Sequence, residues 1–239
     1  MSLLQIQELT KSFAGLTAVN QVDVSVGDHE FLGIIGPNGA GKTTLFSLLS
    51  GQIAPTRGRV VFDGQDITGW SPNRIASTGL VRTFQLMRPF ESMSVLDNVA
   101  IAAHHLHRSR KAARRHALEV IDRVQLDRYV HAPSGSLPTA GLKRLELARA
   151  LALQPRLLLL DEVLAGLVPA ERAPIIELLR EIHGSGVTVM FVEHIMAAVM
   201  ALSQRLLVMA EGRELALGDP REVVSDPRVI EAYLGEEYA

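Results

Sequence analysis

Two hydrophobic patterns alternate along the chain and predict different kinds of strand. Near the N-terminus, apolar residues alternate with polar ones over residues 4–7 and 22–26, as in half-buried antiparallel strands. Further along, almost uninterrupted apolar runs at residues 157–160 and 187–192 are typical of strands buried on both faces of a parallel sheet. Helical spacing between such runs, for example over residues 171–183, predicts an α/β fold with a mostly parallel sheet and an N-terminal antiparallel β subdomain.

A glycine-rich segment, GPNGAGKT at residues 36–43, follows the apolar run at residues 31–35. It fits G-x-x-x-x-G-K-[ST], the phosphate-binding loop, and helical spacing after it gives the strand–loop–helix order that this motif needs. Glycines let backbone N–H groups close around phosphate oxygens at a helix N-terminus. We expect Lys42 to reach the β- and γ-phosphates of ATP and Thr43 to ligate Mg²⁺. The flanking elements disfavour the alternative, a chance glycine-rich turn. The predicted nucleotide-binding residues of this loop are Gly36, Pro37, Asn38, Gly39, Ala40, Gly41, Lys42, Thr43 and Thr44.

Polar side chains follow three further predicted strands. Asp161 and Glu162 come directly after the run at residues 157–160, where a P-loop fold holds Mg²⁺, so we expect Asp161 to be a metal residue and Glu162 to be the general base for an attacking water. Gln85 can reach Mg²⁺ or that water, and His194 can hydrogen-bond the γ-phosphate. Taken alone, Gln85 and His194 are each explained as polar loop residues that make local hydrogen bonds. Their shared position at the ends of strands favours a site instead. The predicted catalytic residues are Glu162, His194, Gln85 and Lys42, and the predicted metal residues are Thr43, Gln85 and Asp161.

The composition narrows the possible functions. The chain has 239 residues, a formal net charge of −2 and no cysteine. The near-neutral charge argues against a general nucleic-acid surface, and the lack of cysteine excludes disulfides, thiolate metal sites and a cysteine nucleophile. The N-terminus has no basic segment followed by an apolar one, and no apolar run approaches the ~20 residues that span a bilayer. We therefore expect a soluble protein whose membrane role comes through a partner.

Residues 95–129 have helical spacing with a basic middle. A solvated helix face explains this stretch, and a contact with anionic lipid headgroups or an acidic partner loop is the alternative. A histidine metal site is disfavoured because no carboxylate lies among the histidines. The basic residues are His104, His105, His107, Arg108, Arg110, Lys111, Arg114, Arg115 and His116.

Taken in order over nearly the whole chain, these residues resemble those of the ATP-binding cassette ATPases of ABC transporters. The family's A-loop aromatic corresponds to Phe13, which lies in an expected turn at residues 10–15, and we expect it to stack on adenine. The signature segment of the family corresponds to residues 137–144. The Walker A, Q-loop, Walker B, catalytic-glutamate and switch-histidine positions fall on the residues already named.

The resemblance implies a single ABC ATPase domain with a P-loop NTPase (RecA-like) core. The core would span residues 1–85 and 152–239, with an inserted helical subdomain at residues 86–151. Within the family the chain is most similar to the ATPases of branched-chain amino-acid-type importers. The segments RTFQ at residues 82–85 and AYLGE at residues 232–236 are among those that carry this likeness.

The function implied by the resemblance is that of an ATP-hydrolysing motor subunit. It would couple ATP binding and hydrolysis to uptake of a small solute, branched-chain amino acids or a related compound. A second cassette, identical or different, would complete a dimer in which each ATP lies between the P-loop of one subunit and the signature of the other. Transmembrane permease subunits would be direct partners, a solute-binding protein an indirect one, and no nucleic acid is expected. The chain would be cytoplasmic, on the inner face of the cell membrane.

Two positions depart from the family pattern. The signature L-S-G-G-Q is replaced here by LPTAG, and Pro138 has neither the hydroxyl nor the backbone N–H of the serine. A one-residue slip would offer Thr139 and Gly141 instead. Val168 occupies the D-loop aspartate position. The P-loop half of the site is therefore complete, while the half offered to the partner's ATP departs from the pattern. The signature residues are Leu137, Pro138, Thr139, Ala140 and Gly141.

Three functions follow from this pattern. The first is the importer motor. The second is a nucleotide-binding regulatory subunit that contributes a weak signature to a heterodimeric transporter. The third, a cassette ATPase acting on DNA or ribosomes, is disfavoured because the chain has one cassette and no heptad repeats between the P-loop and the signature.

Overall fold

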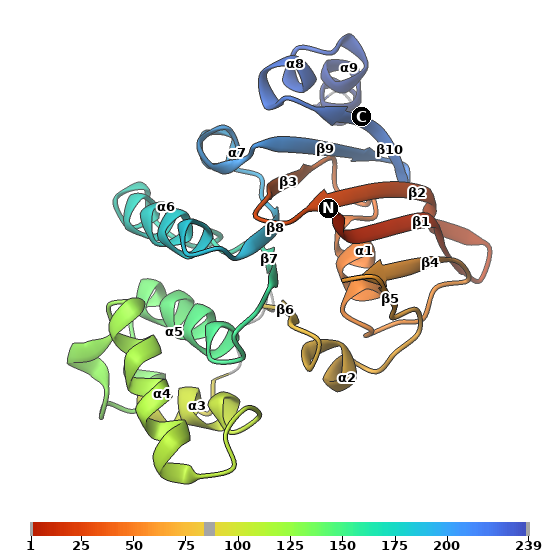
Figure 1. Ribbon diagram of the computed structural model, residues 1–239. Coiled ribbons are helices and arrows are strands. Elements are labelled where there is room, and N and C mark those ends of the chain that lie inside the picture. Colours follow the sequence, from red (N-terminus) through yellow and green to blue (C-terminus); the bar gives the residue numbers. More distant parts are fainter. Residues whose placement is uncertain (1, 84–88, 238–239) are drawn as a thin grey trace. The chain divides into compact units, whose positions relative to one another are not determined.

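The structure is a computed structural model that describes residues 2–83 and 89–237 (Figure 1). The chain forms two compact units. The first comprises Met1–Leu80 with Thr188–Ala239, and the second comprises Val81–Val187. The division into a core and a helical subdomain at residues 86–151 stays a prediction, and Gln85 lies outside the described residues.

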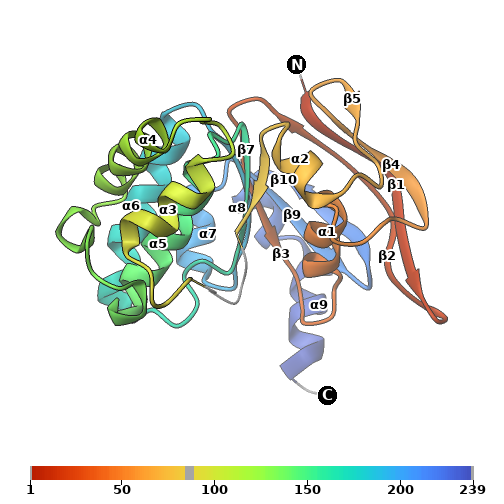
Figure 2. The ribbon, with the colours of Figure 1, turned by 90° about the horizontal axis from the view of Figure 1, so that it is seen from below.

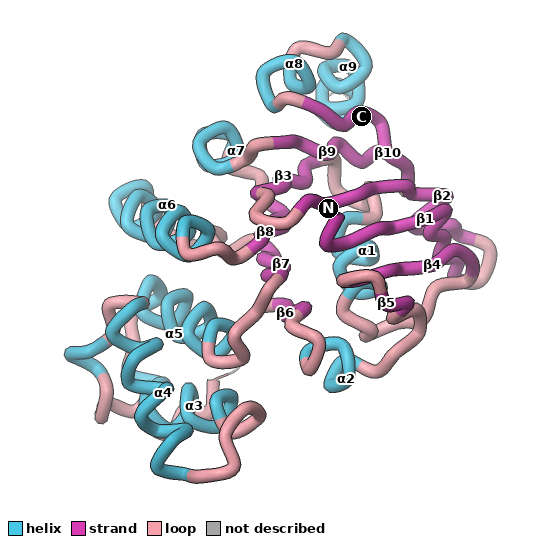
Figure 3. Tube along the Cα trace, in the orientation of Figure 1, coloured by secondary structure: helices cyan, strands magenta, loops and turns pink. Residues whose placement is uncertain are grey.

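The first unit contains a four-stranded sheet in the order β2-β1-β4-β5, with antiparallel pairing throughout (Figure 3). In β2, Val22, Val24 and Val26 are buried while the residues between them are exposed, as the alternating pattern requires. The predicted N-terminal antiparallel subdomain is thus confirmed. The strands are β1 (Ser2–Phe13), β2 (Leu16–Gly27), β4 (Arg57–Phe62) and β5 (Gln65–Asp66).

The turn between β1 and β2 is shorter than the sequence suggested. β1 continues to Phe13, and Ala14 and Gly15 connect it to β2 with φ of 40° and 99°. Positive φ at both central residues is the requirement of a two-residue type I′ hairpin. The expected turn over residues 10–15 is wrong because register shifts in β1 between Ile6 and Lys11 interrupt the alternation that would have revealed a continuous strand.

The other strands of the first unit are largely parallel. β3 pairs in parallel with both β8 and β9, and β10 returns antiparallel to β9. β3 and β8 are buried at every position, and the rings of Phe31 and Phe191 meet edge to face with centroids 5.1 Å apart. The predicted α/β fold with a mostly parallel sheet is confirmed. These strands are β3 (Phe31–Ile35), β8 (Thr188–Val192), β9 (Arg205–Ala210) and β10 (Arg213–Gly218). The helices are α1 (Lys42–Leu49), α2 (Pro72–Ala76), α7 (Met196–Leu202), α8 (Pro220–Val224) and α9 (Pro227–Glu237).

In the second unit, the described residues form the strands β6 and β7 and four α-helices. β7 is buried along its whole length, and the Thr83 amide, just after β6, donates to the Leu159 carbonyl at 2.9 Å. The strands are β6 (Leu80–Arg82) and β7 (Leu157–Asp161). The helices are α3 (Val95–Ala103), α4 (Arg110–Arg123), α5 (Thr139–Leu151) and α6 (Pro169–Gly184), with the short 3₁₀ turns η1 (Asp127–Tyr129) and η2 (Ser134–Ser136).

Helices α3, α4 and α5 lie side by side (Figures 1 and 2). Ser94 caps α3 by accepting a hydrogen bond from the Asp97 amide at 3.0 Å, and the Asp97 carboxylate pairs with Arg114 of α4 at 2.6 Å. The fully buried Asn98 donates to the Ser134 hydroxyl at 3.2 Å and so ties α3 to η2, a few residues before α5. These contacts fix the chain that leads into the signature segment.

Candidate functional site

The glycine-rich loop lies between β3 and α1, in the strand–loop–helix order expected from the sequence. Gly36 and Gly41 have φ of 149° and 96°. A Cβ on Gly36 would lie 2.1 Å from the Met209 carbonyl oxygen, and one on Gly41 would lie 2.3 Å from the Ala18 carbonyl oxygen. Only glycine fits either place, because both backbones pack directly against another strand. The loop is thus held in a compact shape whose tip, at Gly39, is exposed.

Lys42 is the first residue of α1, and its side chain is held within the loop. The residue is 6% exposed, and its Nζ donates to the carbonyl oxygens of Gly36 at 2.5 Å and Pro37 at 2.8 Å. A buried ammonium beside a helix N-terminus is suited to a phosphate group. Thr43 is exposed on the first turn of the same helix.

His194 reaches the same edge of the sheet as the loop. β3 and β8 are adjacent and parallel, and Ile34 lies opposite Val192 in the register. Gly36 and His194 therefore each follow that pair by two residues, at the carboxyl ends of neighbouring strands. His194 is exposed. The structure thus brings His194 and the glycine-rich loop together at one edge, as expected from their positions at strand ends.

Phe13 lies at the end of β1, in the sheet whose Ala18 contacts Gly41 of the loop. The residue is 45% exposed, and Lys11 Nζ lies 4.9 Å from its ring centroid. A partly exposed aromatic ring is suited to stacking on a base. Its contact with adenine stays a prediction.

Asp161 ends β7 in the second unit and is 2% exposed. Its Oδ2 accepts from Arg82 Nη2 at 2.6 Å, while no donor among the described residues reaches its Oδ1. A buried carboxylate with one oxygen left open fits a place beside Mg²⁺ or its water. The described part of the chain has no group of three or more His, Cys, Asp and Glu that could hold a metal ion.

Glu162 follows Asp161 and is half-buried, with a left-handed backbone at φ 50°. Lys42 and Thr43 belong to the first unit and Asp161 and Glu162 to the second, so their meeting around one nucleotide stays a prediction. The same holds for Gln85, which lies outside the described residues.

The signature segment begins α5. Pro138 is the N-cap residue, with φ −65° and ψ 163°, and its carbonyl accepts from the Leu142 amide at 2.9 Å. Pro138 and Thr139 are exposed, Ala140 is half-buried, and Leu137 and Gly141 are buried. The open first turn offers backbone N–H groups to an anion without the serine hydroxyl of the family pattern.

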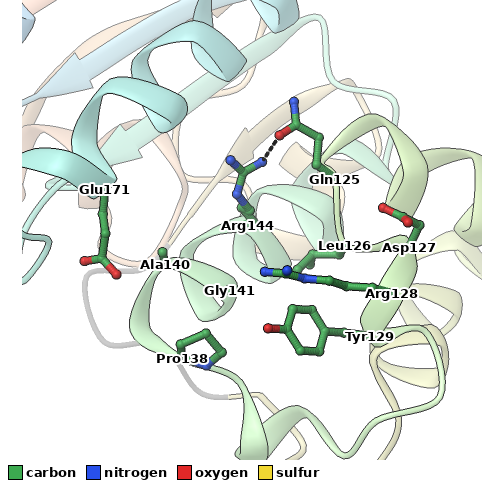
Figure 4. A pocket seen from close by; sticks show the side chains of 10 residues that line it. All are labelled: Gln125, Leu126, Asp127, Arg128, Tyr129, Pro138, Ala140, Gly141, Arg144 and Glu171. Atoms are coloured by element: carbon green, nitrogen blue, oxygen red, sulfur yellow. Dashed lines mark hydrogen bonds between the residues drawn. The ribbon is translucent and has the colours of Figure 1, made fainter.

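A pocket of about 440 Å³ lies against this first turn, between α5, η1 and the start of α6 (Figure 4). Arg144 donates from Nη1 to the Val124 carbonyl at 2.8 Å and to Gln125 Oε1 at 3.1 Å. Burial lowers the pKa of the Arg144 guanidinium, and the nearby charge of Arg128 lowers it further. The lining holds two cations, Arg128 and Arg144, and two carboxylates, Asp127 and Glu171, so its formal charge is balanced. The lining residues are Gln125, Leu126, Asp127, Arg128, Tyr129, Pro138, Ala140, Gly141, Arg144 and Glu171.

Val168 is the N-cap residue of α6 and is 57% exposed. Its amide donates to Glu171 Oε2 at 3.2 Å, and its carbonyl accepts from the Glu171 amide at 2.9 Å. The D-loop position therefore serves as a helix start whose side chain brings no charge.

Sequence reasoning missed two buried cations beside the predicted residues. Arg82 pairs with Asp161, and Lys143, 3% exposed in α5, donates to the Glu162 carbonyl at 3.3 Å. In the sequence, Arg82 is a single charge after the apolar residues 80–81, and Lys143 lies on the predicted helix that follows the signature. Neither pattern indicates which residue the cation contacts, because both contacts join segments that are distant in sequence.

No helix in the part of the chain that the structure describes is long and apolar enough to cross a membrane.

Comparisons with known proteins agree with this geometry. The family model described as "ABC transporter" matches residues 19–165, and that described as "Branched-chain amino acid ATP-binding cassette transporter" matches residues 213–239. The high-affinity branched-chain amino acid transport ATP-binding protein BraF of Pseudomonas aeruginosa is 38% identical, over 98% of both chains. LivG of Escherichia coli, which carries the same description, is 36% identical with the same coverage.

Solved structures give the same result. A nucleotide-free ATP-binding cassette from an ABC transporter superposes with a TM-score of 0.90 at 30% identity, over 98% of this chain and 99% of that one. The ADP conformation of MJ1267, also an ATP-binding cassette of an ABC transporter, gives the same values. A dimeric bacterial cassette, MJ0796, shares the fold with a TM-score of 0.82 at 23% identity, over 91% of this chain and 99% of that one.

Proposed function

This chain belongs to the ABC transporter family of ATP-binding proteins, and on that premise we propose that it is the ATP-hydrolysing motor subunit of an importer for branched-chain amino acids or a related small solute. The observation that carries the proposal is the loop of residues 36–43, in which Lys42 is held by two loop carbonyls at a helix N-terminus. The match of residues 213–239 to the branched-chain amino acid cassette model supports the choice of solute.

Each residue has a role that its position favours. The loop amides and Lys42 bind the phosphates of ATP, and His194, at the end of the neighbouring strand, hydrogen-bonds the γ-phosphate. Thr43 and Asp161 would hold Mg²⁺, which would neutralise charge on the phosphates of ATP. Glu162 accepts a proton from the attacking water, and Gln85 orients that water or contacts the ion.

Partners follow from the same proposal. A second cassette, identical or different, contacts the ATP bound by this chain through its signature segment. The first turn of α5 in this chain contacts the ATP bound by the second cassette. Transmembrane permease subunits contact the chain beside the helical subdomain at residues 86–151, and a solute-binding protein delivers the solute to them. The chain lies in the cytoplasm against the inner face of the cell membrane.

A second candidate function is a nucleotide-binding regulatory subunit in a heterodimeric transporter. Pro138 and Val168 favour it, because the N-cap of α5 has no hydroxyl and the N-cap of α6 has no carboxylate. Such a subunit would bind ATP at its own P-loop but contribute weakly to hydrolysis at the partner's.

The test is ATP hydrolysis by the purified chain, with and without its permease in proteoliposomes that contain the solute-binding protein. The motor function predicts hydrolysis that the permease stimulates and uptake of leucine that ceases with Glu162→Gln in this chain. Lys111→Ala, which changes an exposed lysine of α4, is the matched control for loss of a lysine at Lys42→Ala. Transport that survives Glu162→Gln with unchanged rate would instead support the regulatory function.

A further inference from the structure

Glu162 has a backbone conformation that its residue type rarely adopts. Its φ is 50°, in the left-handed region, where a non-glycine residue persists only when its surroundings hold it. The main-chain conformation sets the direction in which the side chain leaves the backbone. Whatever holds this residue left-handed therefore also directs its carboxylate.

The Glu162 carbonyl oxygen accepts two hydrogen bonds that hold this turn. One comes from the Ala165 amide at 3.0 Å, which closes the turn after β7. The other comes from Nζ of Lys143 at 3.3 Å. The second bond is not local, because it comes from α5, whose first turn is the signature segment at residues 137–141.

The position of Lys143 is unfavourable for a residue with only a structural role. It is 3% exposed, and within the described part of the chain its hydrogen-bond acceptor is this one neutral carbonyl. Burial of an ammonium without a carboxylate partner is costly, and an apolar side chain of similar length would avoid that cost. A charge held at the expense of stability beside a candidate general base is typical of a functional role.

We propose that Lys143 is a positioning residue that holds the main chain of Glu162 and links the signature segment to the hydrolytic step. The proposal rests on the proposed function, in which Glu162 is the general base. Because Lys143 and Gly141 lie within one turn of α5, a shift of this helix when the signature binds the partner's nucleotide is passed to the Glu162 carbonyl through Nζ. Binding of the partner's ATP to the signature thereby changes the position of Glu162, the base that acts on the ATP bound by this chain.

Two substitutions separate this role from a structural one. Lys143→Met keeps the length of the side chain and removes its donor, whereas Lys143→Gln keeps an N–H donor. Arg149→Met is the matched control, because it removes a half-buried cation from the same helix, at a residue whose side chain lies 5.7 Å from the Phe90 ring centroid instead. All three are made in the full chain and measured in complex with the permease.

The kinetic result expected for Lys143→Met is a fall in kcat of about tenfold or more, because small displacements of catalytic groups have effects of this size. KM for ATP and the dissociation constant for nucleotide should stay within about twofold, because the proposed role of Lys143 concerns the position of the base and not the binding of nucleotide. The melting temperature should not fall. Lys143→Gln should recover most of kcat, and Arg149→Met should keep it. Equal kcat losses in the Met and Gln variants, or a wild-type kcat in Lys143→Met, would overturn the proposal.

Hydrogen exchange at the Ala165 amide provides a readout that does not depend on turnover. This amide is bonded to the same carbonyl, so its exchange should be faster in Lys143→Met than in wild type, and unchanged in Arg149→Met. If the wild-type complex hydrolyses no ATP, the proposed function fails, and exchange at Ala165 alone decides whether Lys143 holds the turn. Unchanged exchange in Lys143→Met contradicts the positioning role whatever the activity.

Discussion

Arg82 and Asp161 form an ion pair of 2.6 Å in which the side chains are 6% and 0% exposed. The pair joins β6, which leads toward Gln85, to the end of β7, which carries the proposed metal residue. One carboxylate oxygen is taken by the guanidinium, and the other has no donor among the described residues. Arg82 thus fixes the orientation of the carboxylate while one oxygen stays available.

Arg82→Met should strongly destabilise the protein, because it leaves the Asp161 carboxylate buried without its cation. Loss of one partner from a buried pair costs about 3–5 kcal/mol. The control is Arg114→Met, which breaks the exposed pair with Asp97, where the side chains are 51% and 37% exposed, and should cost less than about 1 kcal/mol. Urea unfolding measures both changes. Similar losses in the two variants would show that burial of the Arg82 pair does not matter.

Lys42→Ala should weaken nucleotide binding, because the bound triphosphate would lose the ammonium that Gly36 and Pro37 hold in the loop. One hydrogen bond to a charged group contributes about 1.5–3 kcal/mol, which corresponds to a loss of affinity of roughly 10- to 150-fold. Calorimetric titration with ATP measures it, and Lys111→Ala, at an exposed lysine of α4, serves as the control. An unchanged affinity in Lys42→Ala would exclude the role given to this residue.

Glu162→Gln should bind ATP normally and fail to hydrolyse it, because an amide cannot take the proton of the attacking water. The loss of a general base typically lowers kcat by ~10²–10⁴-fold. Single-turnover hydrolysis, with nucleotide affinity measured on the same sample, separates chemistry from binding. A rate near that of wild type would mean that another group is the base.

The sequence predicted the elements around those parts of the candidate site whose residues are adjacent in the chain. The glycine-rich loop follows the buried strand β3, and Asp161 and Glu162 stand at the end of the buried strand β7, so local spacing predicts their elements, while their chemistry stays a prediction. Arg82 and Asp161 are 79 positions apart, and nothing in either segment identifies the other as its partner. The hairpin at Ala14 and Gly15 was missed for a different reason, since bulges in β1 hide the alternation that marks a strand.

Phe13→Ala should weaken ATP binding, whereas Phe13→Tyr should preserve it, because stacking of a base on an aromatic ring contributes ~1–3 kcal/mol and needs no particular ring substituent. The ring is 45% exposed, so its removal should change the melting temperature little. The alternative, a core role for Phe13, predicts instead a clear loss of thermal stability in Phe13→Ala. Fluorescence titration with ATP and a thermal melt on the same variants distinguish the two.

The purified chain should be mostly monomeric, with low basal ATPase activity, because Pro138 leaves the signature without its hydroxyl. One lost hydrogen bond to a charged phosphate costs ~1.5–3 kcal/mol, which weakens closure of an ATP-bound homodimer without abolishing it. Pairing with a cassette that carries an intact L-S-G-G-Q, or with the permease, should raise hydrolysis at the P-loop of this chain.

Pro138→Ser in the Glu162→Gln background should therefore strengthen ATP-dependent dimerisation. Pro138 is the N-cap of α5, a position where serine also stabilises a helix, so a gain could arise from the cap alone. A cap effect would appear with or without ATP, as a higher melting temperature of the monomer. Pro138→Ala, which restores the backbone N–H but not the hydroxyl, isolates the contribution of the hydroxyl. Sedimentation velocity with and without ATP measures the association. A tight ATP-dependent homodimer with Pro138 in place, which Pro138→Ser leaves unchanged, would show that backbone amides of α5 suffice to bind the partner's nucleotide.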